Sequence, residues 1–170
     1  MEREGEKVML GMVLLEGIGL SVILLLICAF GIRKGAVEMV YLYHKDVQDR
    51  CVSMGLTTHD KIEKDGKVFK IGGIILYLVY TLVCVYVVNG ARGFLQGFWQ
   101  MFLILSVLNI IDRIFIDEVW VGYTKAWTIP GTEDLKPYIN GHDRCRKWLG
   151  GTVGMAILSA ILAGVFSLIL

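Results

Sequence analysis

IGGIILYLVYTLVCVYVVNGA (residues 71–91) and GFLQGFWQMFLILSVLNII (residues 93–111) are the two stretches that decide the fold. Neither contains a charged residue, and Arg92 alone separates them. A helix needs about 20 apolar residues to cross a hydrocarbon layer of about 30 Å, so each stretch is long enough to span a membrane. Apolar runs this long do not alternate as barrel strands do. The two stretches therefore predict a pair of membrane-spanning helices.

Two further apolar runs flank this pair. Val8–Ile32 contains one charged residue, Glu16, and Leu149–Leu170 contains none. Of the 170 residues, 55% are hydrophobic, and the mean hydropathy is +0.62. A soluble chain of this length cannot bury four such runs in one core. We therefore predict an all-α integral membrane protein, a four-transmembrane-helix bundle that forms a single membrane domain over residues 1–170. The expected spans are about 8–32, 70–91, 93–116 and 149–170.

The Lys and Arg residues between the runs predict the orientation of the chain. They gather in and beside two long connections, about 33–69 and 117–148. The residues concerned are Arg33, Lys34, Lys45, Arg50, Lys61, Lys64, Lys67 and Lys70 for the first connection, and Arg113, Lys125, Lys136, Arg144, Arg146 and Lys147 for the third. Cytoplasmic connections of membrane proteins carry an excess of such residues. We therefore expect a multi-pass protein of the cell inner (cytoplasmic) membrane, with both long connections cytoplasmic and both termini outside.

The first connection contains a helical pattern. Over residues 36–54, apolar side chains recur every three or four positions and charged ones occupy the other faces. This pattern predicts an interfacial helix, or a bent extension of the first span, that lies with its apolar side against the membrane and ends at Gly55. A short second helix, His59–Lys64, is expected to follow it before a turn at Asp65-Gly66.

The third connection contains both prolines of the chain, Pro130 and Pro137. The pair Pro130-Gly131 favours a turn, and Thr132 after it is a good N-cap. The acidic residues Glu133 and Asp134 complement the positive end of a helix. Pro137 fits only the first turn of that helix, so we expect this second interfacial helix to be short or bent.

The inner end of the third run carries the strongest candidate site. At 100° per residue, one helix face presents a polar stripe, which is made of Ser106, Asn109, Arg113, Asp117, Trp120 and Thr124. Arg113 and Asp117 are four residues apart and can pair, while Asp112 and Glu118 are expected to point elsewhere. Charges that adjoin an apolar run are costly unless they face protein, water or lipid headgroups. The alternative to a functional site is an ion pair that locks the helix end.

The polar residues near this helix end are assigned two roles. The carboxylates of Asp112, Asp117 and Glu118 are the candidate catalytic groups, since carboxylates bind cations and act as general acids and bases. The guanidinium of Arg113 suits phosphate or carboxylate groups, which it binds through two parallel hydrogen bonds. The candidate substrate-binding residues are Asn109, Arg113, Trp120, Trp127, Glu133 and Asp134.

Glu16 is the candidate intramembrane acid, about 12 Å from the outer end of the first run. Three polar residues, Tyr80, Thr81 and Gln100, are expected at a similar depth on the neighbouring helices. A carboxyl group at this depth is neutral or paired. Glu16 is therefore a relay for protons or cations, a protonated carboxyl group hydrogen-bonded between helices, or a side chain that reaches the outer interface.

The fourth run has small residues at four-residue spacing. They form three sets: Gly150 with Gly154, Ala156 with Ala160 and Gly164, and Ser159 with Ala163 and Ser167. Such faces let helix backbones approach closely. They predict either packing within the monomer or a homo-oligomer formed through this helix.

No motif identifies a metal or a cofactor. The chain has no phosphate-binding GxxxxGK[ST], no GxGxxG, no HExxH and no GxSxG. His44, His59, His142, Cys51 and Cys145 are too scattered to predict a metal site, although the sequence leaves metal binding by them open. A net charge of +1 gives no reason to expect a nucleic-acid partner. The expected partners are membrane lipids.

Three functions are compatible with the sequence. The favoured one is a small enzyme or binding protein for a lipid or other amphiphile, with its site at the cytoplasmic end of the third span. This reading follows from the polar residues and both long connections gathering on one side. The second is an oligomeric channel or transporter unit for ions or small solutes, and the third is an accessory subunit of a larger membrane complex. Whether the chain is an enzyme is not decided by the sequence.

Overall fold

The structure is a computed structural model that describes residues 2–139 and 141–169, without the side chains of residues 2–3, 141–144 and 146–147. All of its described secondary structure is helical. Four helices are long and apolar enough to cross a membrane, and these stretches are Glu4–Lys34, His59–Val88, Gly93–Val121 and Trp148–Ser167. The predicted all-α bundle with four membrane-spanning helices is thereby confirmed.

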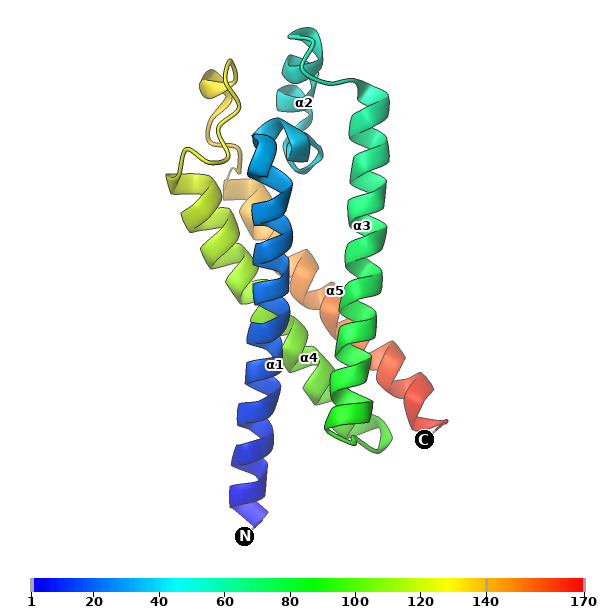
Figure 1. Ribbon diagram of the computed structural model, residues 1–170. Coiled ribbons are helices and arrows are strands. Elements are labelled where there is room, and N and C mark those ends of the chain that lie inside the picture. The colour runs from blue at the N-terminus through cyan, green and yellow to red at the C-terminus, as the bar shows by residue number, and fades with distance from the viewer. Residues whose placement is uncertain (1, 140, 170) are drawn as a thin grey trace.

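The four long helices are α1 (Glu2–Gly31), α3 (His59–Leu82), α4 (Gly93–Ile111) and α5 (Gly141–Ser167). Two of them continue as wider π-helical segments: α3 into η3 (Val83–Val88) and α4 into η4 (Asp112–Val121). Helix α4 packs against both α1 and α5 (Figure 1). Both termini and the short 89–92 connection lie at one end of the bundle, the terminal end, and both long connections lie at the other, the loop end (Figure 1).

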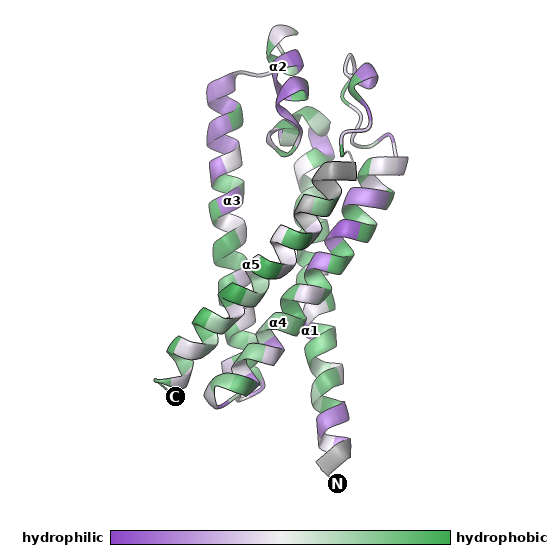
Figure 2. Ribbon diagram, turned by 180° about the vertical axis from the view of Figure 1, so that it is seen from behind, coloured by the Kyte–Doolittle hydropathy of each residue, from purple (hydrophilic) through white to green (hydrophobic). Residues whose placement is uncertain are grey.

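The core of the bundle lies along α4. Leu20 of α1 and Met101 and Ile104 of α4 are fully buried. Helix α1 approaches α4 closely at Gly17, where an added Cβ would lie 2.7 Å from the Cβ of Val107. By contrast, the outer faces of α3 and α5 are apolar and exposed, and hydrophobic residues cover the middle of the bundle (Figure 2). Such a surface suits contact with lipid chains.

Helix α3 starts eleven residues earlier than the predicted span. Thr58 is its N-cap and its side chain accepts a hydrogen bond from the backbone N–H of Lys61. The predicted turn at Asp65-Gly66 is wrong, because the helix passes through both residues without a break. Glycine at position 66 avoids a close contact, because a Cβ there would lie 3.3 Å from the Cβ of Tyr41.

The first connection forms two short helices in place of the single interfacial helix predicted. They are the 3₁₀ segment η2 (Ala36–Leu42) and α2 (Lys45–Ser53), and the chain between them is extended at Tyr43 and His44. Gly55, with φ +71°, follows α2 as predicted. The apolar side of α2 is covered by protein and not by the membrane, since Val47 and Cys51 are buried.

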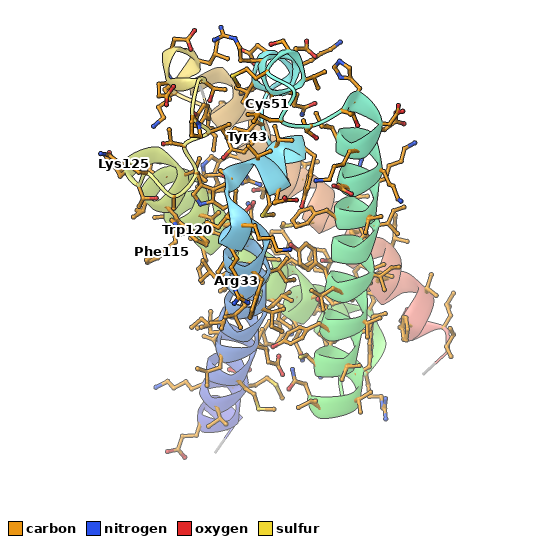
Figure 3. The ribbon with its side chains drawn as sticks, turned by 45° about the horizontal axis from the view of Figure 1, so that its top comes forward. Arg33, Tyr43, Cys51, Phe115, Trp120 and Lys125 are labelled. Carbon is orange, nitrogen blue, oxygen red and sulfur yellow. The ribbon has the colours of Figure 1, made fainter. Side chains whose placement is uncertain are left out.

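The two long connections pack against each other at the loop end. The guanidinium of Arg50 on α2 donates to the carboxylate of Asp134 at 3.1 Å and to the carbonyl oxygen of Gly131 at 3.2 Å. Tyr43 and Cys51 lie in the layer between the connections (Figure 3). These contacts dock α2 against the third connection.

The second predicted interfacial helix is a single 3₁₀ turn, η5 (Glu133–Leu135). The hydroxyl of Thr132 makes no capping hydrogen bond to this turn, and it donates to the carbonyl oxygen of Ile129 at 2.9 Å. Its one proton is thereby used, so the 2.8 Å contact with Tyr138 is donated by the tyrosine hydroxyl. Pro137 follows closely and prevents a longer helix.

Candidate functional site

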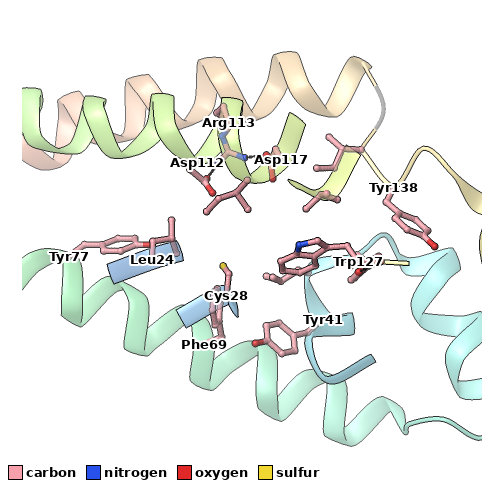
Figure 4. A pocket seen from close by; sticks show the side chains of 15 residues that line it. Leu24, Cys28, Tyr41, Phe69, Tyr77, Asp112, Arg113, Asp117, Trp127 and Tyr138 are labelled. Atoms are coloured by element: carbon pink, nitrogen blue, oxygen red, sulfur yellow. Dashed lines mark hydrogen bonds and ion pairs between the residues drawn. The ribbon is translucent and has the colours of Figure 1, made fainter. Parts of the chain in front are cut away.

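The candidate site is built on η4, the π-helical continuation of α4. In a π-helix the backbone hydrogen bonds join residues five apart and each turn is wider, so side chains five positions apart point in more similar directions than they do in an α-helix. Asp112 and Asp117 are such a pair, and both face the same side (Figure 4). The expectation that Asp112 points away from Asp117 is therefore wrong, because it assumed the 100° step of an α-helix. π-helical turns are frequent at functional sites.

Arg113 lies between these two carboxylates. Its Nη2 is 3.1 Å from an oxygen of Asp112, and its Nη1 donates to Asp117, as the sequence predicted. Its Nε donates to the amide oxygen of Asn109 at 3.4 Å. The three charged side chains are only 18–23% exposed, so water screens their attraction weakly.

A cavity of about 360 Å³ opens in front of these three charges. Figure 4 shows Asp112, Arg113 and Asp117 on one wall and side chains from α1, η2 and α3 on the opposite wall. The lining residues are Leu24, Cys28, Tyr41, Leu42, Tyr43, Phe69, Tyr77, Asp112, Arg113, Ile116, Asp117, Val121, Trp127, Tyr138 and Ile139. The cavity is thus charged on one side and largely aromatic on the other.

Trp127 closes one end of the cavity. The side chain is buried, and its indole nitrogen has no hydrogen-bond partner among the described residues. That nitrogen faces the space between the two walls (Figure 4). A buried donor without an acceptor costs about 1–3 kcal/mol. Beside the cavity there is therefore a buried N–H group that lacks an acceptor among the described residues.

The position of Trp127 is fixed from two sides. Its carbonyl oxygen accepts a hydrogen bond of 2.6 Å from the hydroxyl of Tyr43, and its ring meets that of Trp120 edge-on at 5.4 Å. The ring of Tyr43 also packs edge-on against Tyr138, at 5.0 Å. Trp120 thus supports the cavity from outside, since it does not line it.

Two tyrosines beside the cavity, Tyr41 and Tyr43, stay neutral at physiological pH. Burial, reinforced by the nearby Asp65, raises the pKa of Tyr41 to about 12. Burial likewise raises the pKa of Tyr43 well above its usual value. Both residues therefore present an uncharged hydroxyl group beside the cavity. Burial also raises the pKa of the Cys51 thiol, which keeps that thiol protonated.

The structure separates the predicted site residues into groups. Asp112, Arg113, Asp117 and Trp127 line the main cavity, whereas Asn109 is buried behind Arg113. Glu118 lines a neighbouring hollow of about 430 Å³, which Asp117 also reaches.

Glu133 and Asp134 do not reach the main cavity. Glu133 accepts a hydrogen bond of 2.8 Å from the backbone N–H of Gly131, and Asp134 pairs with Arg50. In the structure these two carboxylates hold the third connection in shape and dock it onto α2.

Several cavity residues were not predicted as site residues. They come from four separate places in the chain: Cys28 from α1, Tyr41 from η2, Tyr43 from the position after η2, and Tyr77 from α3. Each belongs to an apolar run or an apolar helix face, and no local pattern distinguishes it. One available signal was the aromatic pair Phe69 and Tyr77, which are eight residues apart and so share a helix face.

A narrow groove adjoins the cavity between α1 and α3. It has a volume of about 200 Å³ and is almost wholly apolar. Its lining residues are Leu24, Ile27, Val68, Phe69, Gly72, Gly73, Leu76 and Tyr77. Three of these residues, Leu24, Phe69 and Tyr77, also line the cavity. The charged cavity and the apolar groove therefore share a boundary.

Glu16 belongs to a separate cluster near the terminal end. Its carboxylate accepts a hydrogen bond of 3.0 Å from the side-chain amide of Asn89, which also donates to the side chain of Gln100 at 3.0 Å. The hydroxyl of Tyr80 donates to the backbone oxygen of Glu16. Tyr80 and Gln100 thus lie at the predicted depth. Thr81 is buried, and its hydroxyl has no hydrogen-bond partner among the described residues.

The small residues of α5 divide between two environments. Ser159 and Ala163 are fully buried, and an added Cβ on Gly97 of α4 would lie 3.5 Å from Ala163. This set serves packing within the monomer. Gly150 and Gly154 are exposed, with no atom near a Cβ added to either. An oligomer formed through that face stays a prediction.

Metal ligands are not gathered in the part of the chain that the structure describes. No group of three or more His, Cys, Asp or Glu residues there is placed to hold a metal ion. The side chain of His142 lies outside the described residues. Cys51 is buried and Cys145 is exposed, and both are free thiols.

Comparison with known proteins identifies no relative. No family model matches the chain, and no curated protein or solved structure is significantly similar to it.

Proposed function

We propose that this protein binds the polar head of a membrane amphiphile in the cavity at the loop end. The observation that carries the proposal is the buried indole N–H of Trp127, which faces a cavity beside Arg113 and has no acceptor among the described residues. An oxygen-rich head would supply that acceptor. The cavity lies at the end of a membrane-spanning helix, where lipid heads are found.

Arg113 favours a phosphate or carboxylate as the bound group. A guanidinium has five N–H donors, and the contacts to Asn109, Asp112 and Asp117 involve one donor from each of its three nitrogens. Donors on the two terminal nitrogens therefore remain to reach an anionic oxygen. Asp112 and Asp117 line the same cavity and would be the acid–base groups of any reaction there.

Permeation is less well supported than binding. The two polar clusters, around Glu16 and around Arg113, lie towards opposite ends of the bundle. Between them the described core is mostly apolar and is filled by Leu20, Met101 and Ile104, and the hydroxyl of the buried Ser21 there donates to the carbonyl oxygen of Gly17. A path for ions needs polar groups across the whole thickness.

An accessory-subunit role is the second candidate. It is favoured by α5, since only 11% of the apolar stretch within Trp148–Ser167 is buried inside the protein. Cross-linking in native membranes tests it: a larger partner captured through residues of α5, such as the exposed Ile157 and Ile161, would support this role.

We place the loop end in the cytoplasm of a cell with an inner membrane, because the Lys and Arg residues gather there. Cys145 is the exposed thiol among four free cysteines, since Cys28, Cys51 and Cys84 are buried. A membrane-impermeant maleimide should label the native protein in inverted vesicles and not in intact cells, with Cys145→Ser as the control. Labelling in intact cells would reverse the orientation.

A binding titration tests the proposed function. The protein in lipid nanodiscs should bind dodecyl phosphate saturably, and Arg113→Gln should weaken binding at least ten-fold, about 1.4 kcal/mol. The matched control is Arg33→Gln, which removes the same charge from an exposed position at the same end of the bundle. Equal affinity in all three proteins, or no saturable binding at all, would contradict the proposal.

A further inference from the structure

The groove between α1 and α3 suggests how the rest of the ligand is held. We propose that this groove is the binding subsite for the hydrocarbon chain of the same amphiphile, so that the ligand enters sideways from the bilayer. The inference rests on the proposed function, because it places the chain of the ligand whose head occupies the cavity.

The first support is the shared boundary of the two hollows. Leu24, Phe69 and Tyr77 line both the cavity and the groove. On one side of this boundary lie the charges of η4 and Trp127 (Figure 4). The groove on the other side is lined by Ile27, Val68 and Leu76. The polar cavity therefore matches the head of an amphiphile, and the apolar groove that adjoins it matches the hydrocarbon chain.

The second support is how α3 is attached to the rest of the bundle. Towards the terminal end, the hydroxyl of Tyr80 donates to the backbone oxygen of Glu16 on α1. At the loop end, the ring of Phe69 packs against that of Tyr41 at 5.4 Å, and Gly66 lies close to Tyr41. Between these two attachments α3 is separated from α1 by the groove.

The third support is the pair of glycines in the groove wall. A Cβ added to Gly72 or to Gly73 would have no atom within 4 Å. These glycines are therefore not needed for close approach of α1 to α3. Because they lack side chains, the groove stays wide enough at these positions for a chain of methylene groups.

Filling the groove tests the inference. Gly72→Leu should weaken binding of dodecyl phosphate at least ten-fold in nanodiscs and leave binding of methyl phosphate, which has the same head and no long chain, unchanged. The matched control is Gly154→Leu on α5, where an added Cβ also meets nothing within 4 Å. Comparing variants with each other cancels the partitioning of dodecyl phosphate into the bilayer.

A second measurement maps the chain directly. A dodecyl phosphate with a photoreactive diazirine in mid-chain should cross-link residues 68–77 of α3 and 24–27 of α1, and Arg113→Gln should remove these cross-links. This readout uses the native protein, so it does not depend on how well Gly72→Leu folds.

The outcomes separate this inference from the proposed function. If Gly72→Leu leaves the affinity for dodecyl phosphate unchanged while Arg113→Gln abolishes binding, the head site stands and the chain subsite is overturned. Cross-links spread evenly over the lipid-facing side of α5 would overturn it as well. If neither phosphate compound binds saturably, the proposed function fails together with the inference.

Discussion

Helix α1 meets its two neighbours in opposite ways. Against α4 it is so close that a single added carbon at Gly17 would overlap Val107. Against α3 it leaves a groove in which carbons added at Gly72 and Gly73 meet nothing. The comparison shows that glycine in a membrane helix marks close packing in one contact and vacant space in another. Only the surrounding side chains distinguish the two cases.

Breaking the tight contact should have the largest effect. In Gly17→Leu, the new Cβ would lie 2.7 Å from Val107 and 3.1 Å from the backbone oxygen of Ile104, so α1 and α4 must separate. We expect a loss of about 3 kcal/mol, at the upper end for overpacked cores. The measurement is thermal unfolding in detergent. Gly11→Leu, on the same helix with nothing within 4 Å, is the control, and equal stability of the two variants would refute the contrast.

A smaller effect is expected from the ion pair on the cavity wall. Asp117→Asn removes the carboxylate that pairs with the guanidinium of Arg113, and both side chains are only 18% exposed. The substitution should lower the free energy of unfolding by about 2 kcal/mol. Glu63→Gln removes the corresponding charge from the Glu63–Lys67 pair, whose side chains are about two-thirds exposed, and should cost little. Both pairs have four-residue spacing, so equal losses in denaturation experiments would mean that burial at the cavity has no energetic role.

The packing of Trp127 should be sensitive to one hydroxyl group. Tyr43→Phe removes the donor to the backbone oxygen of Trp127 and should cost about 1 kcal/mol. It should also weaken binding of dodecyl phosphate, because the indole N–H loses its fixed position. Tyr123→Phe removes a hydroxyl from a side chain that is 82% exposed, and it should change neither quantity. If the two variants behave alike, Tyr43 does not position the tryptophan.

The smallest effect is a dependence on high pH. The pKa of Tyr41 is raised to about 12, whereas an unfolded tyrosine ionises near pH 10. The contribution of Tyr41 to stability is therefore complete below about pH 10 and is lost as the pH rises towards 12. The midpoint temperature of thermal unfolding should consequently fall more steeply over this pH interval for the wild-type protein than for Tyr41→Phe. Parallel curves would show that Tyr41 is not desolvated in the folded state.

The parts of the fold that depend on local pattern could be predicted from the sequence. The four spans follow from uninterrupted apolar runs, and the Arg113–Asp117 pair follows from four-residue spacing. The widening of η4 could not be predicted, because α- and π-helical turns of the same sequence differ only by a shift in hydrogen bonding. That widening is what turns Asp112 towards Asp117.

The walls of the cavity depend on how separate segments meet. Cys28, Tyr41 and Tyr77 are distant in sequence and share no pattern, so their convergence results from tertiary packing. The same holds for α2, whose apolar side predicts a membrane contact as readily as the protein contact that Arg50 and Asp134 secure.

The most direct test is a cryo-electron microscopy map of the protein purified in nanodiscs of its native lipids. We expect elongated density with its head between Arg113 and Trp127 and its tail running along α1 and α3 past Gly72. A cavity and groove that are both empty, in a map that resolves bound lipids elsewhere on the bundle, would contradict it.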